Sequence, residues 1–468
     1  MADQARPNIL FLFTDDQRFD TINALGHTEL TTPHMDALVH RGTAFTNAHI
    51  MGGSCDAVCM PSRAMLMTGR TLYHLKAQGQ TIPEEHLMLG EVLQAAGYTT
   101  FGTGKWHNGP AAYARSFTTG GEIFFGGMDD HWNVPACDFD PTGRYNNAKP
   151  FISDPRTTNR VVHRHVDHIK PGKHSSELFA DAAIEFLQGH DGATPFFAYV
   201  SFMAPHDPRT MPEEYLRMYN PGAVALPESF KPQHPFDNGE LRVRDELLAG
   251  FPRTPAEIRR HTAEYYAMIT HLDAQIGRIV DALEERGWLE NTIIVLAGDN
   301  GLAIGRHGLM GKQNLYDHSL HVPLLISGPG IPAYETREAQ TYLLDIYPTL
   351  CDLVEVTIPD TVEGRSLVPA LQDPEETVRD TLLFAYRGCQ RAVQAGRYKL
   401  IEYVVGADRT TQLFDHHEDP WELHNLAYEP AQQSRVEGLR RELRRWRDEL
   451  DDTQPKQGED FWSGFESR

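Results

Sequence analysis

Cysteine is scarce in this sequence, and basic residues are outnumbered by acidic ones. Five cysteines among 468 residues are too few, and odd in number, to indicate a disulfide framework. The chain lacks an apolar run long enough to span a membrane. Its 43 lysines and arginines stand against 65 aspartates and glutamates, a formal net charge of -22. This charge argues against nucleic acid or an anionic membrane as a partner, so an anionic ligand would need a local basic cluster.

The composition is that of a soluble globular protein, at 40% hydrophobic and 23% charged residues. The length predicts one large domain and a smaller one. The N-terminal stretch Met1–Ile9 is neither basic nor long enough for a signal peptide. We therefore expect a cytoplasmic protein, or a periplasmic one if the sequence has been trimmed.

The sequence pattern changes after Pro374, which divides the chain into predicted domains 1–374 and 375–468. In the second domain, Leu382–Tyr386 reads as a strand and Arg391–Ile401 as a hairpin turning at residues 395–396. A helix is expected from about Ala431 to Asp451. These elements predict a small antiparallel sheet with a C-terminal helix.

Four predicted strands of the first domain end in polar residues. Continuous apolar runs of this kind are typical of central strands buried on both faces. In an open α/β sheet, ligands bind beyond the carboxyl ends of the strands, so these polar residues are expected to converge. They are Asp15 and Asp16 after Asn8–Phe13, Lys105 and His107 after Tyr98–Gly102, His206 after Phe196–Phe202, and Asp299 and Asn300 after Thr292–Ala297.

The segment Cys59-Met60-Pro61-Ser62-Arg63, followed by Thr68-Gly69-Arg70, is the stretch richest in chemical groups. A helix beginning near Pro61 would place Arg63 one turn from Cys59 on the same face. The residues also suit a buried cysteine with Arg63 in a surface ion pair. A zinc site using Cys55 and Cys59 is not favoured, because no second cysteine pair follows.

Five separated motifs, in order, resemble the pattern of the sulfatase family. The resemblance covers Asn8 to about Gly330 and implies an alkaline-phosphatase-like α/β fold, with a large mixed sheet flanked by helices and a smaller C-terminal antiparallel sheet. The motifs are Asp15-Asp16, Cys59-Met60-Pro61-Ser62-Arg63, Gly104-Lys105-Trp106-His107, Pro205-His206, and Asp299-Asn300-Gly301 with the downstream Gly311-Lys312.

The resemblance also implies the role of each site residue. Cys59 would be converted to formylglycine, whose hydrated aldehyde attacks the sulfur of a sulfate ester. Asp15, Asp16, Asp299 and Asn300, with residue 59, would hold one divalent metal, and these hard oxygen ligands favour calcium, with magnesium or manganese possible. The remaining residues would bind sulfate (Arg63, Lys105, Lys312) or carry protons (His107, His206).

The implied function is hydrolysis of a sulfate monoester carried by a small molecule or a sugar. A formylglycine-generating maturation enzyme would be a transient partner, while the oligomeric state stays open. Two alternatives remain: a phosphonate monoester hydrolase or phosphodiesterase of the same superfamily, and a non-catalytic binding protein with a degenerate site. The pocket's count of charges, with one metal, favours a sulfate over a dianionic phosphate monoester.

The sequence does not name the alcohol that carries the sulfate. Two loop-rich insertions, residues 108–174 and 209–253, are expected to shape the substrate pocket together with Asp207 and Arg209. His307 and Asp317 are candidate supporting residues. A metal site at His163, His165 and His168 is disfavoured, because no carboxylate or cysteine lies at ligand spacing.

Overall fold

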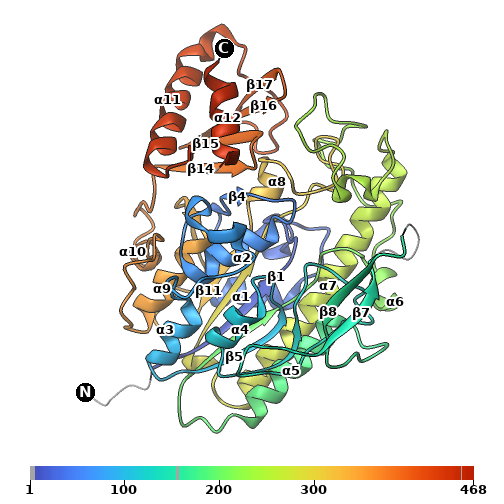
Figure 1. Ribbon diagram of the computed structural model, residues 1–468, viewed down its shortest axis with the longest axis vertical. Coiled ribbons are helices and arrows are strands. Elements are labelled where there is room, and N and C mark those ends of the chain that lie inside the picture. Colours follow the sequence, from blue (N-terminus) through green and yellow to red (C-terminus); the bar gives the residue numbers. More distant parts are fainter. Residues whose placement is uncertain (1–5, 154–157, 455, 468) are drawn as a thin grey trace.

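The computed structural model describes residues 6–153, 158–454 and 456–467 (Figure 1). Its larger sheet contains β1 (Asn8–Thr14), β2 (Gly42–Phe45), β5 (Thr99–Lys105), β6 (Thr119–Phe124), β9 (Phe196–Ser201), β10 (Thr292–Gly298), β11 (Leu324–Ser327) and β12 (Glu335–Arg337). The order is β12-β2-β11-β10-β1-β9-β5-β6. β11 runs antiparallel to both its neighbours, so the sheet is mixed, as predicted.

Helices flank this sheet. Those of the first 374 residues are α1 (Pro33–Arg41), α2 (Cys59–Thr68), α3 (Leu89–Ala95), α4 (Pro110–Ser116), α5 (Ser175–Gly189), α6 (Glu213–Leu216), α7 (Pro255–Glu285), α8 (Asp317–Leu320), α9 (Ile346–Leu353) and α10 (Val368–Gln372). The long helix α7 begins directly after Thr254, whose side chain caps it by accepting a hydrogen bond from the Glu257 amide. It packs beside α5 (Figure 1).

The central strand β1 is buried on both faces. Ile9, Phe11 and Phe13 lie in the core that includes side chains of α2 and α9. Leu10 and Leu12 point the other way, into the core that includes α5 and α7. The alternation explains why the strand reads as a continuous apolar run.

Strands β10, β1, β9 and β5 are neighbours and all run parallel. Phe13 of β1 pairs with Ala297 of β10 and Ser201 of β9, and Ser201 pairs in turn with Gly104 of β5. The four strands whose polar ends were predicted to converge are thus adjacent. Their carboxyl ends meet at one edge of the sheet.

The second sheet contains β14 (Thr381–Tyr386), β15 (Gln390–Ala395), β16 (Tyr398–Val405) and β17 (Asp408–Asp415), which pair antiparallel in sequence order. The predicted hairpin is confirmed, with Ala395 opposite Tyr398. Helices α11 (Gln433–Glu449) and α12 (Lys456–Glu466) accompany this sheet, and α12 was not predicted. The fold class predicted from the sequence is confirmed.

A short strand from the first part of the chain completes the second sheet. β4 (Gly52–Gly53) pairs parallel with β14, just before the segment that contains Cys59. The division of the chain into two domains at residue 375 stays a prediction. β4 belongs to the first predicted domain but pairs with a strand of the second. The smaller pairs are β3 (Ala48–His49) with β13 (Thr341–Tyr342), and β7 (Ala148–Ile152) with β8 (Val161–His165).

Two local predictions differ from the structure. Helix α2 begins at Cys59 rather than near Pro61, so the cysteine lies in its first turn. Residues 108–174 contain β6, which extends the main sheet by pairing with β5. Glycines at 120 and 121 weaken the alternation that would have revealed this strand.

In the ranges that the structure describes, we find no helix with both the length and the apolar character that a membrane span needs.

Replacing Leu10 with alanine should destabilise the fold by about 2–5 kcal/mol, because the side chain is fully buried between β1 and the α5/α7 layer. The midpoint of urea unfolding, followed by circular dichroism, measures the effect. Leu87→Ala is the matched control, since Leu87 is 42% exposed, and its effect should stay within about 0.5 kcal/mol. Equal shifts for both variants would contradict the assignment of β1 to the core.

Candidate active site

The predicted site residues lie together at the carboxyl edge of the parallel strands. A chain of contacts shorter than 4 Å connects all ten, although they come from six separate segments. The ten residues are Asp15, Asp16, Cys59, Arg63, Lys105, His107, His206, Asp299, Asn300 and Lys312.

Cys59 lies at the start of α2, where the partial positive charge of the helix N-terminus is concentrated. Its Sγ lies 3.5 Å from Lys105 Nζ and 3.5 Å from His107 Nδ1. Burial raises the pKa of the Cys59 thiol, and the nearby Lys105 and Lys312 only partly oppose it. Since a neutral thiol is a poor nucleophile, the unmodified cysteine is not activated for attack.

Three buried carboxylates form the floor of the site. Asp15, Asp16 and Asp299 are each at most 1% exposed. Asp16 adopts a left-handed backbone conformation, with φ of 63°, and its amide donates to Asp299 Oδ1 at 3.1 Å. The Tyr265 hydroxyl of α7 donates to the Asp16 carbonyl at 2.6 Å. These two bonds hold the strained turn so that both aspartates face the site.

Each carboxylate has a basic partner. Arg63 contacts Asp299 at 2.9 Å and Asp15 at 3.4 Å, Lys105 pairs with Asp15, and Lys312 pairs with Asp16. Arg63 also donates to the Ser201 hydroxyl and the Lys105 carbonyl. The guanidinium of Arg63 therefore connects the carboxylates of Asp15 and Asp299 to the ends of β5 and β9.

The two carboxylates that share Arg63 differ in proton affinity. Burial alone would raise the pKa of Asp15, but Lys105, His206 and Arg63 hold it well below its ordinary value. Burial, together with the negative charge of Asp15, raises the pKa of Asp299. The basic side chains thus stabilise the charge of Asp15 more than that of Asp299.

The donor set fits a divalent cation. Asp15 Oδ1 and Asn300 Oδ1 are buried oxygens without a hydrogen-bond partner among the residues that the structure describes. Leaving such acceptors unpaired is costly, and a cation would satisfy both. Ligand atoms of Asp15, Cys59 and Asp299 lie within 4.8 Å of one another, as do those of Asp15, Asp16 and His206.

The two histidines approach different members of the cluster. The His107 ring is next to Cys59, and burial together with Lys105 holds its pKa well below the ordinary value. The Nδ1 of His206 donates to the Asp207 carbonyl at 2.8 Å. Its Nε2 is directed towards Asp16 Oδ2, at 3.8 Å.

Comparison with known proteins agrees with this geometry. The family model described as Sulfatase matches residues 7–356. The chain belongs to the sulfatase family. A second model, described as N-sulphoglucosamine sulphohydrolase, C-terminal, matches residues 305–449 of this sulfatase. The family membership makes the protein a sulfuric ester hydrolase, as the sequence motifs predict.

Individual relatives span most of the sulfatase chain. An ulvan-active sulfatase of Formosa agariphila is 30% identical over 442 residues, which cover 91% of this chain and 78% of the relative. A protein solved in complex with its substrate D-glucosamine-2-N,6-O-disulfate has a TM-score of 0.72 at 22% identity, covering 96% of this chain and 99% of that chain. The phosphonate monoester hydrolase of Agrobacterium radiobacter has a TM-score of 0.75 at 23% identity, covering 95% and 96%. At these identities the two structures show the fold alone.

Some supporting residues escaped the sequence analysis. Ser201 is the last residue of β9, and its polar character at the end of an apolar strand is the signal that could have revealed it. Glu246 accepts hydrogen bonds from the amides of Met310 and Gly311, at 2.9 and 2.8 Å, and so holds the loop that carries Lys312. Nothing in the local sequence around Glu246 marks it as such a support.

The two residues expected to shape the substrate pocket have different direct partners. Asp207 pairs with Arg244, from the second insertion. Arg209 instead contacts His261 of α7, at 2.9 Å. Of the predicted supporting residues, His307 stacks on Tyr316 at 4.0 Å, and Asp317 lies in a separate histidine cluster.

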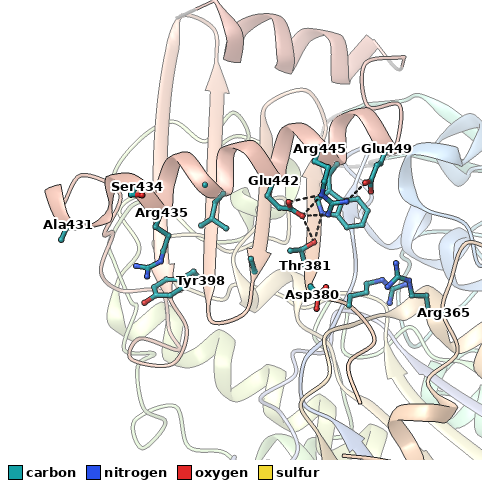
Figure 2. A pocket seen from close by; sticks show the side chains of 15 residues that line it. Arg365, Asp380, Thr381, Tyr398, Ala431, Ser434, Arg435, Glu442, Arg445 and Glu449 are labelled. Carbon is teal, nitrogen blue, oxygen red and sulfur yellow. Dashed lines mark hydrogen bonds and ion pairs between the residues drawn. The ribbon is translucent and has the colours of Figure 1, made fainter. Parts of the chain in front are cut away.

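A large cavity lies elsewhere. It measures about 860 Å³ and lies beside α11, with Arg379, Glu442 and Arg445 among its lining residues and none of the ten site residues (Figure 2). Arg445 pairs with Glu442 and Glu449, and Arg379 pairs with Asp345. Two of the four arginines that line this cavity are thus already paired with carboxylates, and the cavity lacks the carboxylate cluster that lies beside Cys59.

Added Ca²⁺ should stabilise the wild-type sulfatase against urea, by about 2.7 kcal/mol at a hundredfold excess over the dissociation constant. Asp299→Asn should lose most of this gain, because it removes one buried carboxylate from the cluster. Asp281→Asn, at an exposed position of α7, is the control and should keep it. Equal Ca²⁺ stabilisation of all three proteins would rule out this cluster as the cation site.

Proposed function

We propose that this sulfatase hydrolyses sulfate monoesters at residue 59 after Cys59 has been converted to formylglycine. One observation carries the proposal: Cys59 begins a helix with Lys105 Nζ and His107 Nδ1 each 3.5 Å from its Sγ, and the carboxylate cluster lies beside it. A maturation enzyme would act on the chain before it folds around this buried position. Converted residue 59 would supply a hydroxyl of its hydrated aldehyde as the nucleophile.

Asp15, Asp16, Asp299 and Asn300 would hold the divalent cation. Their oxygen atoms favour Ca²⁺, with Mg²⁺ or Mn²⁺ as alternatives. When bound, the cation would supply positive charge for the sulfate oxygens. Arg63, which is committed to Asp299 and Ser201, acts as a positioning residue for the carboxylates.

The remaining residues act on the substrate. Lys105, paired with Asp15, and Lys312, paired with Asp16, bring fixed positive charge to the sulfate. His107 is positioned to accept the proton of the attacking hydroxyl, because its Nδ1 is next to residue 59. His206 is positioned to donate a proton to the leaving alcohol, since its Nε2 faces the cluster while its Nδ1 is held by the Asp207 carbonyl.

We further propose a sulfated sugar as the substrate. The relative named an ulvan-active sulfatase and the structural neighbour bound to a sulfated glucosamine support this class. The second insertion, residues 209–253, also supports a sugar substrate. Its Arg244, whose side chain is 47% exposed, pairs with the carboxylate of Asp207, the residue after His206. A polar rim of this kind suits a hydroxyl-rich leaving group.

A phosphonate monoester hydrolase is the second candidate, favoured by the structural neighbour with that activity. The charges of the site weigh against phosphate monoesters. Its three carboxylates are paired with three basic side chains, so the charge of one cation remains for the ester. A dianionic phosphate would use that charge completely, whereas a monoanionic sulfate leaves an excess to stabilise the transition state.

Mass spectrometry of the tryptic peptide that contains Cys59 should show an aldehyde in place of the thiol side chain in active protein. Cys59→Ala should reduce sulfatase activity to background, because no nucleophile remains. Cys55→Ala, four residues away and partly exposed, is the matched control and should keep both the aldehyde and the activity. Full activity in protein whose Cys59 is entirely unmodified would disprove the formylglycine mechanism.

Matched esters with one leaving group should separate the two candidate functions. Fully converted enzyme should turn over the sulfate monoester with at least about tenfold higher kcat/KM than the phosphonate monoester. A phosphate monoester of the same alcohol should react more slowly still, owing to its second negative charge. Higher efficiency on the phosphonate than on the sulfate would instead favour the phosphonate hydrolase.

A further inference from the structure

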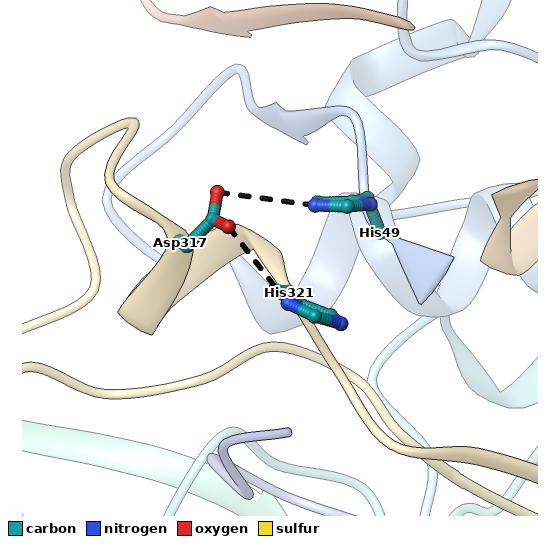
Figure 3. A group of neighbouring side chains, drawn as sticks. All are labelled: His49, Asp317 and His321. Atoms are coloured by element: carbon teal, nitrogen blue, oxygen red, sulfur yellow. Dashed lines mark ion pairs between the residues drawn. The ribbon is translucent and has the colours of Figure 1, made fainter. Parts of the chain in front are cut away.

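A second cluster of buried ionisable side chains lies apart from the ten site residues. It consists of His49 in β3, Asp317 at the start of α8, and His321 immediately after α8 (Figure 3). One ligand atom from each lies within 4.8 Å of the other two. An antiparallel bridge between His49 and His321 fixes their backbones relative to each other.

Hydrogen bonding determines which nitrogen of His49 faces the cluster. His49 Nδ1 lies 3.0 Å from the Asn47 carbonyl, and a carbonyl only accepts, so Nδ1 carries the proton. In the neutral ring, Nε2 is therefore a bare lone pair. It is buried and without a hydrogen-bond partner in the described part of the chain. It faces Asp317 Oδ1 at 3.8 Å, as Figure 3 shows.

A lone pair that faces a carboxylate in a buried site is unfavourable unless a proton or a metal ion lies between them. The separation of 3.8 Å is too long for a direct hydrogen bond. His321 has the same relation to the other oxygen, with Nδ1 3.8 Å from Asp317 Oδ2. Two ligands of a tetrahedral zinc ion, each about 2.0–2.2 Å from the metal, lie roughly 3.4 Å apart. Both observed separations are close to this spacing.

The rings are held in place by their surroundings. His49 and His321 stack with centroids 4.7 Å apart, and Phe19 stacks on His321 at 3.8 Å. The bond from His49 Nδ1 to a backbone carbonyl is the outer-shell contact that orients metal-binding histidines. The imidazoles therefore need little reorganisation to bind an ion.

Lys399 is the main competitor for the same carboxylate. Its Nζ donates to Asp317 Oδ1 at 2.6 Å and to Glu422 Oε1 at 2.8 Å. Because Glu422 gives the ammonium a second carboxylate, Lys399 stays paired if Asp317 turns towards an ion. A further imidazole lies nearby: His416 Nδ1 is 3.7 Å from Asp317 Oδ2, while its Nε2 contacts Glu422 at 3.2 Å.

We propose that His49, Asp317 and His321 form a second metal site, which binds a borderline transition-metal ion of the Zn²⁺ class. Two imidazole nitrogens and one carboxylate select zinc over calcium, in contrast to the oxygen ligands near Cys59. Asp317 also contacts Lys399 of β16, so the ion lies where the second sheet meets the first part of the chain. Its role is to stabilise this junction.

Zinc binding to chelator-stripped protein tests the proposal. Asp299→Asn serves as the background, because it weakens the cation site near Cys59. This protein should bind one Zn²⁺ per chain by elemental analysis and gain stability against urea. Combining this background with His49→Gln or His321→Gln should weaken zinc binding by at least about tenfold. Even the loss of a residue that only supports a metal ligand has an effect of this size, and these substitutions remove a ligand itself. His424→Gln, with a side chain 76% exposed, is the matched control and should bind normally.

X-ray absorption at the zinc edge decides the matter if the histidine variants fail to fold. The zinc-loaded Asp299→Asn protein should show two imidazole ligands and one or more oxygens. A shell of oxygen ligands alone would overturn the proposal, as would undiminished zinc binding by folded His49→Gln. Absence of zinc binding in the background protein would mean that Lys399 is the cation that Asp317 binds, and would also overturn it.

Discussion

The burial of three carboxylates at the ends of apolar strands is the constraint on which the site depends. Asp15, Asp16 and Asp299 are shielded from water, and isolated charges in such surroundings are very costly. Lys105 pairs with Asp15, Lys312 pairs with Asp16, and Arg63 contacts both Asp299 and Asp15. Removing one partner of a buried pair typically costs about 3–5 kcal/mol, because the other charge is left uncompensated. The basic residues are thus required for the fold of the site.

The order of strands in the sheet fixes where these carboxylates and their basic partners lie. The parallel order β10-β1-β9-β5 brings four strand ends side by side, and α2 approaches them with its first turn. Ser62 donates to the Asp299 carbonyl at 2.6 Å, while Arg63 contacts the Asp299 side chain. The helix that presents Cys59 is therefore anchored directly to a strand end, which holds residue 59 beside the carboxylates.

The C-terminal sheet is tied to this arrangement through more than one contact. β4, which leads into the Cys59 segment, pairs with β14, and the Asp56 carboxylate just beyond it pairs with Arg387. Lys399 reaches Asp317, five residues after Lys312. The second sheet therefore contacts one segment that leads into Cys59 and another that follows Lys312.

The sequence by itself determined which strands are central and which side chains end them. Unbroken apolar runs can only be satisfied between two covering layers, and polar residues placed directly after them must meet at one edge. The sequence also predicted Cys59 and Arg63 as one unit, because four residues are one helical turn.

Only the tertiary structure decided how these residues pair. In the folded chain, Arg63 pairs with Asp299 and Ser201. Glu246 supports the loop that carries Lys312. His49 lies next to Asp317 and His321. These contacts join positions up to 272 residues apart, taking His49 and His321 as the extreme. No local periodicity encodes them, since they depend on strand order and on the packing of loops.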